Sequence, residues 1–409
     1  MGDSLDLIEL PRDKLMVGMA LKYTLRDQGG TVLLAKGQKI DTQATLAAIK
    51  ARGRLFVAIE ESDEGIRLMM AGLTEMSRKD APIKDFSKFL MSGSAQGDDK
   101  LTGSLFQRWS DVESKLRGVL ASSKGTTEFE PKVQQVYDYV KLLLAEDSAG
   151  SQFLLFHRSV THYGGYSALH SLLCAMLSQL VANVFNLPDA ERRALGCAAL
   201  TMNIGMTSLQ DELALQKQAP SPGQRALIDS HAVLGRQMLA QSGVKDVLWL
   251  EAVAQHHNTM TGPDKLADWE PVMRITRILQ TIDKYTAAMS PRKSRSGRTA
   301  RDSVRSVVVQ ADAKHDEVGT SLVSILGLSP PGTYVKLGNG ETAVVLKRGL
   351  KPAEPIVATV LNKNDEPIAM PRPIDISRGL VPIQATIAAT GVRVNLNMET
   401  MLKLMPRTT

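Results

Sequence analysis

Apolar residues return at helical spacing through the middle of this chain. From about residue 106 to residue 325 they recur every three or four positions, which is the period of an α-helix that buries one face. One such face comprises Leu169, Leu172, Met176, Leu180 and Val184. The uncharged apolar run at 171–187 is interrupted by amide side chains and is shorter than the ~20 residues of a membrane span. We therefore expect a buried core helix here and no membrane span.

A different pattern precedes this helical region. Residues 13–60 contain two short β-prone stretches separated by Gly29 and Gly30, as in a hairpin turn, and then a helix-then-strand signal. Residues 92–104 are rich in Ser, Gly and Asp and lack periodic apolar positions, which is typical of a flexible linker. The pattern predicts a small module joined by a linker to the helical domain.

Beyond the helical region the chain turns β-prone again. Two such runs flank Asn339 and Gly340, a dipeptide typical of a tight hairpin. The predicted fold class is mainly α: an all-helical domain flanked by a small N-terminal α/β or β-rich module and a small C-terminal β appendage. The predicted segments are the N-terminal module 1–62, the linker 63–105, the helical domain 106–325, the β appendage 326–380 and a C-terminal tail 381–409.

One helix start can be predicted residue by residue. Ser221 is suited to be an N-cap, Pro222 to the first turn, and Gln224 to complete a capping box. His231 would then lie on this helix.

Composition narrows the class of protein. The formal net charge of +6 over 409 residues is spread along the chain, apart from a basic cluster at 292–301, and aromatic residues are scarce. No dedicated DNA binding is expected from this distribution. The two cysteines, Cys174 and Cys197, lie in apolar helical stretches, where a free thiol behaves as a small hydrophobe. Reduced thiols and an acidic start without an apolar leader favour a cytoplasmic protein.

Polar residues with metal-binding chemistry gather in the helical region. They are His170, His231, His256, His257 and Asp283. The histidines have apolar neighbours at helical spacing: Ile228 and Leu234 share a face with His231, and Leu250 and Val253 share one with His257. A single histidine in such a place is more often a core or surface residue whose ring nitrogens are hydrogen-bonded within the protein. Several together favour a site, because buried polar groups require partners.

These residues resemble the motifs of the bacterial HD-GYP family, whose members hydrolyse cyclic di-GMP with bound metal ions. Tyr166 to Ser171 match its Tyr-x-x-x-His-Ser segment, which implies His170 as a metal ligand. Ser230 and His231 match its Ser-His-Pro segment, and His256 and His257 match its His-His-Glu segment.

The final part of the resemblance covers residues 277–295. Asp283 falls on the Asp of Arg-Ile-x-x-x-x-Asp-x-Tyr, and Arg292, Lys293 and Arg295 fall on the family's Arg-Pro-Tyr-Arg stretch. The resemblance implies an HD-type helical fold with these basic residues as phosphate contacts. The alternative interpretation is an ordinary basic loop exposed to solvent, because runs of like charge usually form such loops.

The sequence departs from the family at its most important motif. The family's His-Asp-Ile-Gly-Lys is replaced by Met202, Asn203, Ile204, Gly205 and Met206. The Gly-Tyr-Pro loop is also missing. No catalytic residue is therefore secure, since the bridging carboxylate of a two-metal site and a phosphate-binding lysine are both lost. We predict that Asp211 and Glu212 face solvent and do not replace the lost acid.

Three imidazoles remain in place. His231, His256 and His257 are a plausible set for one divalent Fe, Mn or Zn ion, and Asp283 would accept a hydrogen bond from a nearby histidine. The alternative is that these histidines are inherited packing residues.

Three functions follow from these interpretations. The leading hypothesis is a degenerate HD-GYP-like signalling protein that binds a cyclic dinucleotide or a protein partner without efficient hydrolysis. The second is a metal-dependent cyclic di-GMP phosphodiesterase with a reduced metal site. The third is a structural adaptor whose helical domain docks a signalling protein.

Overall fold

The computed structural model divides the chain into two compact units, Met1–Lys100 and Leu101–Thr409. The structure describes residues 7–10, 15–18, 21, 24–26, 32–34, 38–51, 55–58, 101–121, 128–295, 297–308 and 316–406. The predicted turn at Gly29 and Gly30 and the predicted linker residues 92–100 lie outside this description.

The N-terminal unit is a small α/β module, as predicted. Its antiparallel strands follow the order β1-β4-β2-β3. The elements are β1 (Leu7–Leu10), β2 (Leu25–Arg26), β3 (Val32–Leu34), α1 (Gln43–Ala51) and β4 (Leu55–Ala58). Buried leucines and isoleucines from the strands, α1 and the connecting segments, including Leu25, Ile40 and Leu46, form a core of its own.

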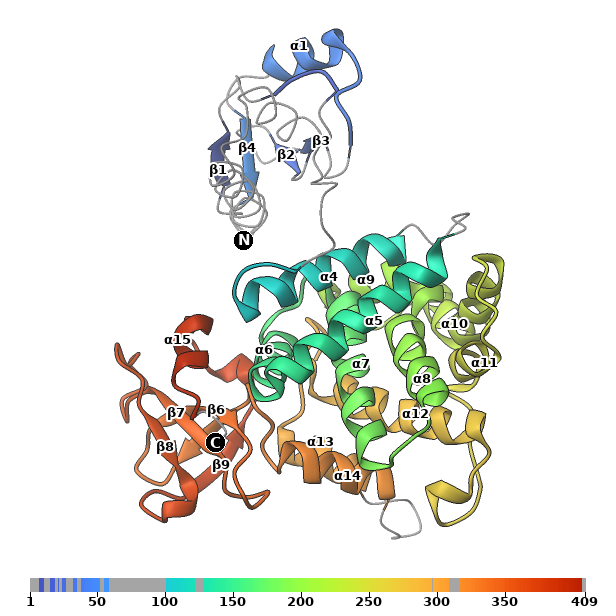
Figure 1. Ribbon diagram of the computed structural model, residues 1–409. Coiled ribbons are helices and arrows are strands. Elements are labelled where there is room, and N and C mark those ends of the chain that lie inside the picture. The colour runs from blue at the N-terminus through green and yellow to red at the C-terminus, as the bar shows by residue number, and fades with distance from the viewer. Residues whose placement is uncertain are drawn as a thin grey trace. The chain divides into compact units, whose positions relative to one another are not determined.

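The second unit begins with a set of α-helices around one continuous apolar core (Figure 1). These helices are α4 (Leu105–Ala121), α5 (Phe129–Glu146), α6 (Ser148–Thr161), α7 (Tyr166–Val184), α8 (Asp189–Thr201), α9 (Thr207–Leu215), α10 (Pro222–Gln241), α11 (Val247–Gln255), α12 (Pro271–Met289), α13 (Ala300–Val308) and α14 (Glu317–Leu326). Short 3-10 turns lie at η2 (Ile204–Met206) and η3 (Leu266–Asp268).

Helix α7 is the core helix that the sequence predicts. By length and composition it would be able to cross a membrane, but 78% of its apolar stretch is buried inside the protein. It packs against α6, α8 and α12. The predicted face holds for Leu169, Leu172 and Met176, whereas Val184 at the last turn is 51% exposed.

Helix α10 starts as predicted. The Ser221 hydroxyl accepts from the Gln224 backbone N–H, the Gln224 side chain accepts from the Ser221 N–H, and Pro222 occupies the first turn. The capping box satisfies two backbone donors that the helix itself leaves unpaired.

A five-stranded antiparallel sheet of order β8-β7-β6-β5-β9 follows the helices. Its elements are β5 (Tyr334–Leu337), β6 (Thr342–Lys347), β7 (Ile356–Leu361), β8 (Pro373–Asp375) and β9 (Ile383–Ile387), with η4 (Ile376–Arg378) between β8 and β9 and with η5 (Ala389–Gly391) and α15 (Met398–Lys403) after β9. The predicted hairpin joins β5 to β6, with Gly340 at φ 85°. Strand β9 lies beyond residue 380, so the sheet extends into the segment predicted as a tail.

The side chains of β6 alternate between the two faces of the sheet, and those on one face pack against the helices. Val344 and Leu346 belong to the helical core, while Ala343 and Val345 belong to a separate cluster on the other face. Successive side chains of a strand point to opposite faces, so one strand contributes to both cores.

Candidate functional site

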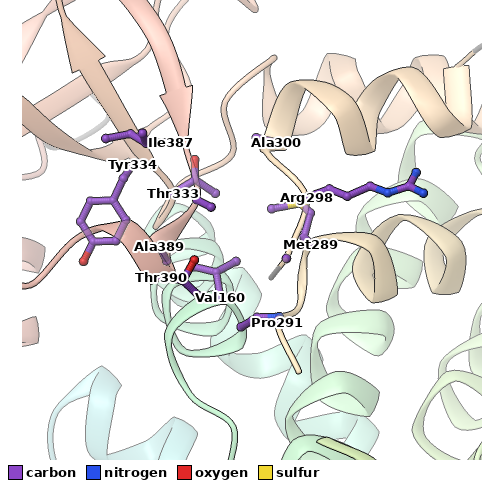
Figure 2. A pocket seen from close by; sticks show the side chains of 12 residues that line it. Val160, Met289, Pro291, Arg298, Ala300, Thr333, Tyr334, Ile387, Ala389 and Thr390 are labelled. Atoms are coloured by element: carbon purple, nitrogen blue, oxygen red, sulfur yellow. The ribbon is translucent and has the colours of Figure 1, made fainter. Parts of the chain in front are cut away.

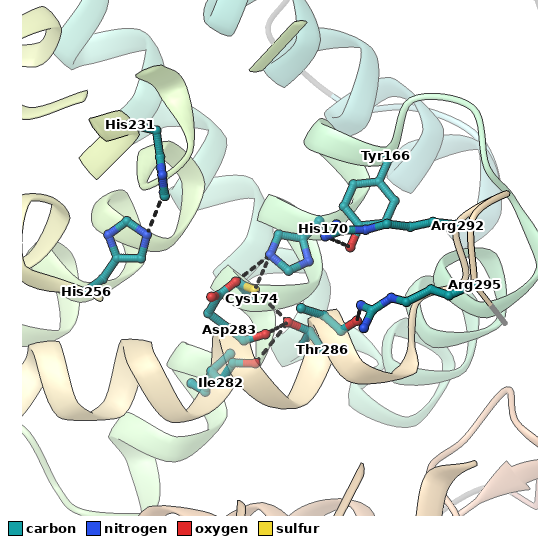
Figure 3. A network of polar contacts seen from close by, with 11 residues as sticks. Tyr166, His170, Cys174, His231, His256, Ile282, Asp283, Thr286, Arg292 and Arg295 are labelled. Carbon is teal, nitrogen blue, oxygen red and sulfur yellow. Dashed lines mark hydrogen bonds and ion pairs between the residues drawn. The ribbon is translucent and has the colours of Figure 1, made fainter. Parts of the chain in front are cut away.

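Four helices bring the predicted residues together. His170 lies on α7, His231 on α10, and Asp283 on α12, while His256 caps the end of α11 and His257 follows it. Figure 3 shows the His231–His256 pair on one side of Asp283 and His170 on the other. Residues up to 113 positions apart in sequence therefore share one site.

Glycine allows one of the close approaches. A Cβ on Gly205 would lie 2.4 Å from the carbonyl oxygen of His231 and 3.0 Å from the backbone nitrogen of Gly235. Only a residue without a side chain fits between η2 and α10 at this distance. The loop that carries the family's His-Asp position is therefore held directly against the helix that carries His231.

His231, His256 and His257 form a compact cluster. Their ring centroids lie 5.1 Å (His231–His256), 4.9 Å (His231–His257) and 4.1 Å (His256–His257) apart. Each offers one ring nitrogen, and these three nitrogens lie within 4.8 Å of one another. Three converging imidazoles are a donor set that Zn, Fe and Mn accept.

Hydrogen bonds fix the tautomers of the two buried rings. His231 Nδ1 lies 2.5 Å from the carbonyl oxygen of Ile228, and His256 Nδ1 lies 2.7 Å from that of Val253. A carbonyl only accepts, so each Nδ1 carries the proton and, in the neutral ring, each Nε2 presents a lone pair. The two Nε2 atoms face each other at 3.2 Å. Two facing lone pairs call for a cation between them, so the residues fit a metal ion.

The surroundings keep these rings neutral. Burial lowers the pKa of His256 to about 3, and burial also lowers the pKa of His231. Neutral imidazole is the form that binds metal. His257 itself is exposed, so the prediction that it shares a buried face with Leu250 and Val253 is wrong. Helix α11 ends before it, and His256 takes the inward position.

His170 and Asp283 form an ion pair across α7 and α12. The His170 Nε2 donates to the Asp283 Oδ1 at 2.8 Å. Burial opposes charge on both groups, but the Cys174 thiol and the bond to Asp283 hold the pKa of His170 well above its usual value. The hydrogen bond from His170 and the charge of that ring hold the pKa of Asp283 far below its usual value despite burial. Asp283 thus accepts a histidine hydrogen bond, as predicted, and is anionic.

The predicted phosphate contacts lie beside this pair. The Arg292 guanidinium carbon lies 5.3 Å from the centroid of the Tyr166 ring, and that ring stacks on His170 at 5.6 Å with an interplanar angle of 12°. Paired backbone hydrogen bonds between Arg292 and Arg295 shape the loop, and the Lys293 N–H bonds to the carbonyl of Ala214. The Arg292 side chain therefore lies beside the ring that stacks on His170, while the Arg295 guanidinium donates to the Ala287 carbonyl.

The family's His-Asp position carries no charge here. Met202 is fully buried and Asn203 is 5% exposed. Met206 ends η2 and is half-buried. Met202 and Asn203 follow the end of α8. A hydrogen bond connects α8 to α11, because the Trp249 indole N–H donates to the Thr201 hydroxyl at 2.8 Å. A thioether and a neutral amide therefore lie in a packed environment, just before Gly205, which contacts the backbone of His231.

The solvent-facing prediction for Asp211 is wrong. Its carboxylate accepts from the backbone N–H of Ser167 at 2.7 Å and from the Ser167 hydroxyl at 2.9 Å. These bonds cap the N-terminus of α7, where an anion is favoured by the helix dipole. Glu212 is exposed, as predicted.

Sequence reasoning assigned Cys174 to the apolar core and missed its position beside His170. The two residues are four apart on α7, and the Cys174 Sγ lies 3.7 Å from the His170 Nε2. The i, i+4 spacing was the available signal.

A cavity elsewhere is too small for a nucleotide. It has a volume of about 20 Å³ and lies where Met289, Pro291 and Arg298 approach Tyr334 and Ala389 (Figure 2). That volume holds about one water molecule, whereas small-molecule sites typically measure about 300–1,000 Å³.

Comparisons with known proteins cover the region that carries this site. Residues 155–318 match the family model described as HD domain. A cyclic di-GMP phosphodiesterase of Pseudomonas aeruginosa is 26% identical over 186 residues, which cover 45% of each chain, so the match spans under half of that relative. A solved HD-GYP-type protein of Bdellovibrio bacteriovorus has a TM-score of 0.45 and 12% identity, over 78% of this chain and 98% of that one.

The matched region and its histidines define an HD-domain protein. Within that class, the chain is similar to the HD-GYP proteins.

Proposed function

We propose that this chain is a cytoplasmic HD-GYP signalling protein of the cyclic di-GMP pathway that binds a cyclic dinucleotide, or a signalling protein, without efficient hydrolysis. The observation that carries the proposal is that Met202 and Asn203, at the family's His-Asp position, are buried and uncharged in a chain whose His231, His256 and His257 form a compact cluster. The relative in Pseudomonas is named as a cyclic di-GMP phosphodiesterase, which supports this ligand class.

The loss of charge matters because of how phosphodiesters are cleaved. Two cations about 3.5–4 Å apart stabilise both the attacking and the leaving oxygen and lower the pKa of water. A carboxylate is the usual bridge between hard cations, and the amide of Asn203 is neutral and supplies one carbonyl oxygen. The Met202 thioether is a poor ligand for such ions. One of the two metal positions is therefore weakened.

The residues that remain are suited to binding. His231, His256 and His257 would hold one Fe, Mn or Zn ion, and a bound ion would polarise a phosphoryl oxygen. Arg292 supplies positive charge on the side of His170 that carries Tyr166, and Lys293 and Arg295 follow it in the same loop. Guanidinium groups grip phosphate oxygens in pairs, which suits a dinucleotide with two phosphates.

A turnover assay tests this proposal. The full-length protein, loaded with Mn²⁺ or Fe²⁺ under reducing conditions, is incubated with cyclic di-GMP, and the dinucleotide is quantified by chromatography. We expect it to stay uncut while calorimetry reports binding. Metal-dependent cleavage at ordinary enzyme rates, about 1 s⁻¹ or faster, would contradict the proposal.

The second candidate function is a phosphodiesterase with a reduced, single-metal site. The observation that favours it is the facing pair of His231 and His256 Nε2 atoms, 3.2 Å apart, which suits a bound cation. Elemental analysis after gentle purification, together with the turnover assay, separates the two candidate functions. The single-metal phosphodiesterase requires both bound metal and turnover of cyclic di-GMP.

A further inference from the structure

We infer that His170, Cys174 and Asp283 form a zinc site of their own, beside the three-histidine cluster. The HD-GYP resemblance implies His170 and Asp283 as ligands, but it does not assign Cys174. A thiolate in this place changes which metal the site prefers. The inference does not depend on whether a dinucleotide binds.

The helices present the three side chains to one point. His170 and Cys174 are four residues apart on α7 and share one face, and Asp283 reaches them from α12 (Figure 3). Their ligand atoms lie within 4.8 Å of one another. The His170 Nε2 is 2.8 Å from the Asp283 Oδ1 and 3.7 Å from the Cys174 Sγ. Donors around tetrahedral zinc lie roughly 3.3–3.6 Å apart, so small side-chain shifts suffice.

The orientation of the histidine is fixed in advance. His170 is 2% exposed, and its ring stacks on Tyr166 at 5.6 Å. Its Nδ1 has no hydrogen-bond partner in the described part of the chain, so the stacking on Tyr166 and the bond from Nε2 to Asp283 orient the ring. The Nε2 is the atom directed at Cys174 and Asp283.

The donor chemistry favours zinc over the hard cations of an acid-rich site. Thiolate is a soft ligand that selects zinc or copper(I), imidazole suits zinc, and a carboxylate completes a three-ligand set that leaves one position open. Cys174 is completely buried, whereas Asp283 is 16% exposed and gives the ion a route of entry. Binding would replace the protons on Cys174 and His170.

A hydrogen-bonded network without an ion is the competing interpretation. In that network the Cys174 thiol would donate to the Thr286 hydroxyl oxygen, 3.2 Å away, and His170 would donate to Asp283. Spectroscopy distinguishes the two, because only a bound metal gives a sulfur-to-metal transition.

The experiment uses cobalt as a probe for zinc in the full-length protein. After removal of metal with a chelator, Co²⁺ is added and absorbance is recorded, followed by titration with Zn²⁺. We expect a thiolate-to-cobalt charge-transfer band in the near ultraviolet that saturates and then disappears as Zn²⁺ displaces Co²⁺. A cobalt-loaded protein without this band overturns the site.

Variants identify the sulfur. Cys174→Ser should abolish the band, while Cys197→Ser, which alters the other buried thiol, should keep it. His257→Ala should also keep it, because that residue belongs to the other cluster. A band that survives in folded Cys174→Ser, or is lost in folded Cys197→Ser, contradicts the assignment.

Two features keep the test decisive. If Cys174→Ser fails to fold, the Cys197→Ser protein still carries Cys174 as its sole cysteine, so its cobalt spectrum alone decides. Hydrolysis of cyclic di-GMP would refute the proposed function and leave this spectrum unchanged, so the two failures are distinguishable.

Discussion

Gly205 lies against the backbone of His231, where an added Cβ would come within 2.4 Å of the histidine's carbonyl oxygen. The neighbour is backbone on a long helix, which cannot swing aside as a flexible side chain would. This contact connects the altered Met202–Met206 segment to the three-histidine cluster of His231, His256 and His257.

The first prediction concerns this contact. Gly205→Ala should separate η2 from α10, lower the free energy of unfolding by about 1–3 kcal/mol and weaken metal binding at the three histidines. Gly118→Ala is the matched control: a Cβ there meets nothing within 4 Å in a helix interior, so it should be neutral or stabilise by about 0.5–1 kcal/mol. Urea denaturation and metal titration measure both. Equal stability of the two variants would contradict the close contact.

A second prediction concerns a buried histidine outside the site. His157 is 5% exposed, its Nδ1 lies 3.3 Å from the Gly332 carbonyl, and its ring stacks on Phe153. Burial lowers its pKa to about 4. The unfolded chain takes up this proton near pH 6.5, and the folded chain does so only near pH 4. Stability is therefore complete above pH 6.5 and falls as the pH drops from there toward 4.

His157→Phe removes this titration. Between pH 7.5 and pH 4.5 the native protein should lose about 2–3 kcal/mol more stability than the variant does. Chemical denaturation at both pH values, with chelator present, gives the difference. Parallel losses in the two proteins would show that His157 titrates normally in the fold.

Local signals in the sequence predicted local structure well. The Ser221 and Gln224 capping box and the Asn339–Gly340 hairpin both form, because each depends on residues within a few positions of one another. The fold class was also predictable, since the helical period persists over the whole HD region.

Contacts between distant segments escaped the sequence. Asp211 caps α7 from 44 positions away, and Cys174 meets Thr286 from 112 positions away. The spacing of apolar residues along the sequence does not predict such contacts, because they depend on how whole helices pack together. The error at His257 has a different cause: the predicted helical face was extended two residues past Gln255, where α11 ends.

The phosphate-clamp hypothesis gives a third prediction. Arg292→Ala combined with Arg295→Ala should weaken cyclic di-GMP binding by on the order of 100-fold, because charge-assisted hydrogen bonds contribute about 1.5–3 kcal/mol each. Arg378→Ala, which removes a 76% exposed side chain in the sheet region, is the control. Calorimetry measures all three proteins. Unchanged affinity in the double variant would favour the structural-adaptor hypothesis.

The three-histidine cluster gives a fourth prediction. Adding Zn²⁺ or Mn²⁺ at 100 times its dissociation constant should stabilise the protein by about 2.7 kcal/mol, because the unfolded chain lacks the site. His256→Ala should abolish most of this gain at that cluster. His162→Ala, at an exposed position after α6, should retain it. Thermal unfolding with and without metal measures the effect, and an equal gain in both variants would exclude the cluster as the site.

The fifth prediction restores the lost motif. Met202→His together with Asn203→Asp returns an imidazole and an anionic carboxylate to the end of α8, just before Gly205, which packs against the backbone of His231. We expect a second equivalent of Mn²⁺ or Fe²⁺ and cyclic di-GMP cleavage at least about 100-fold above the native protein, the size of effect that one electrostatic stabiliser contributes. The two single variants are the controls: Asn203→Asp alone should destabilise the metal-free protein, because it buries an unpaired charge, and should regain stability with metal. Metal analysis and chromatography of the dinucleotide measure the outcome. A folded double variant that binds no additional metal and cleaves nothing would mean that Met202 and Asn203 are not what silences this site.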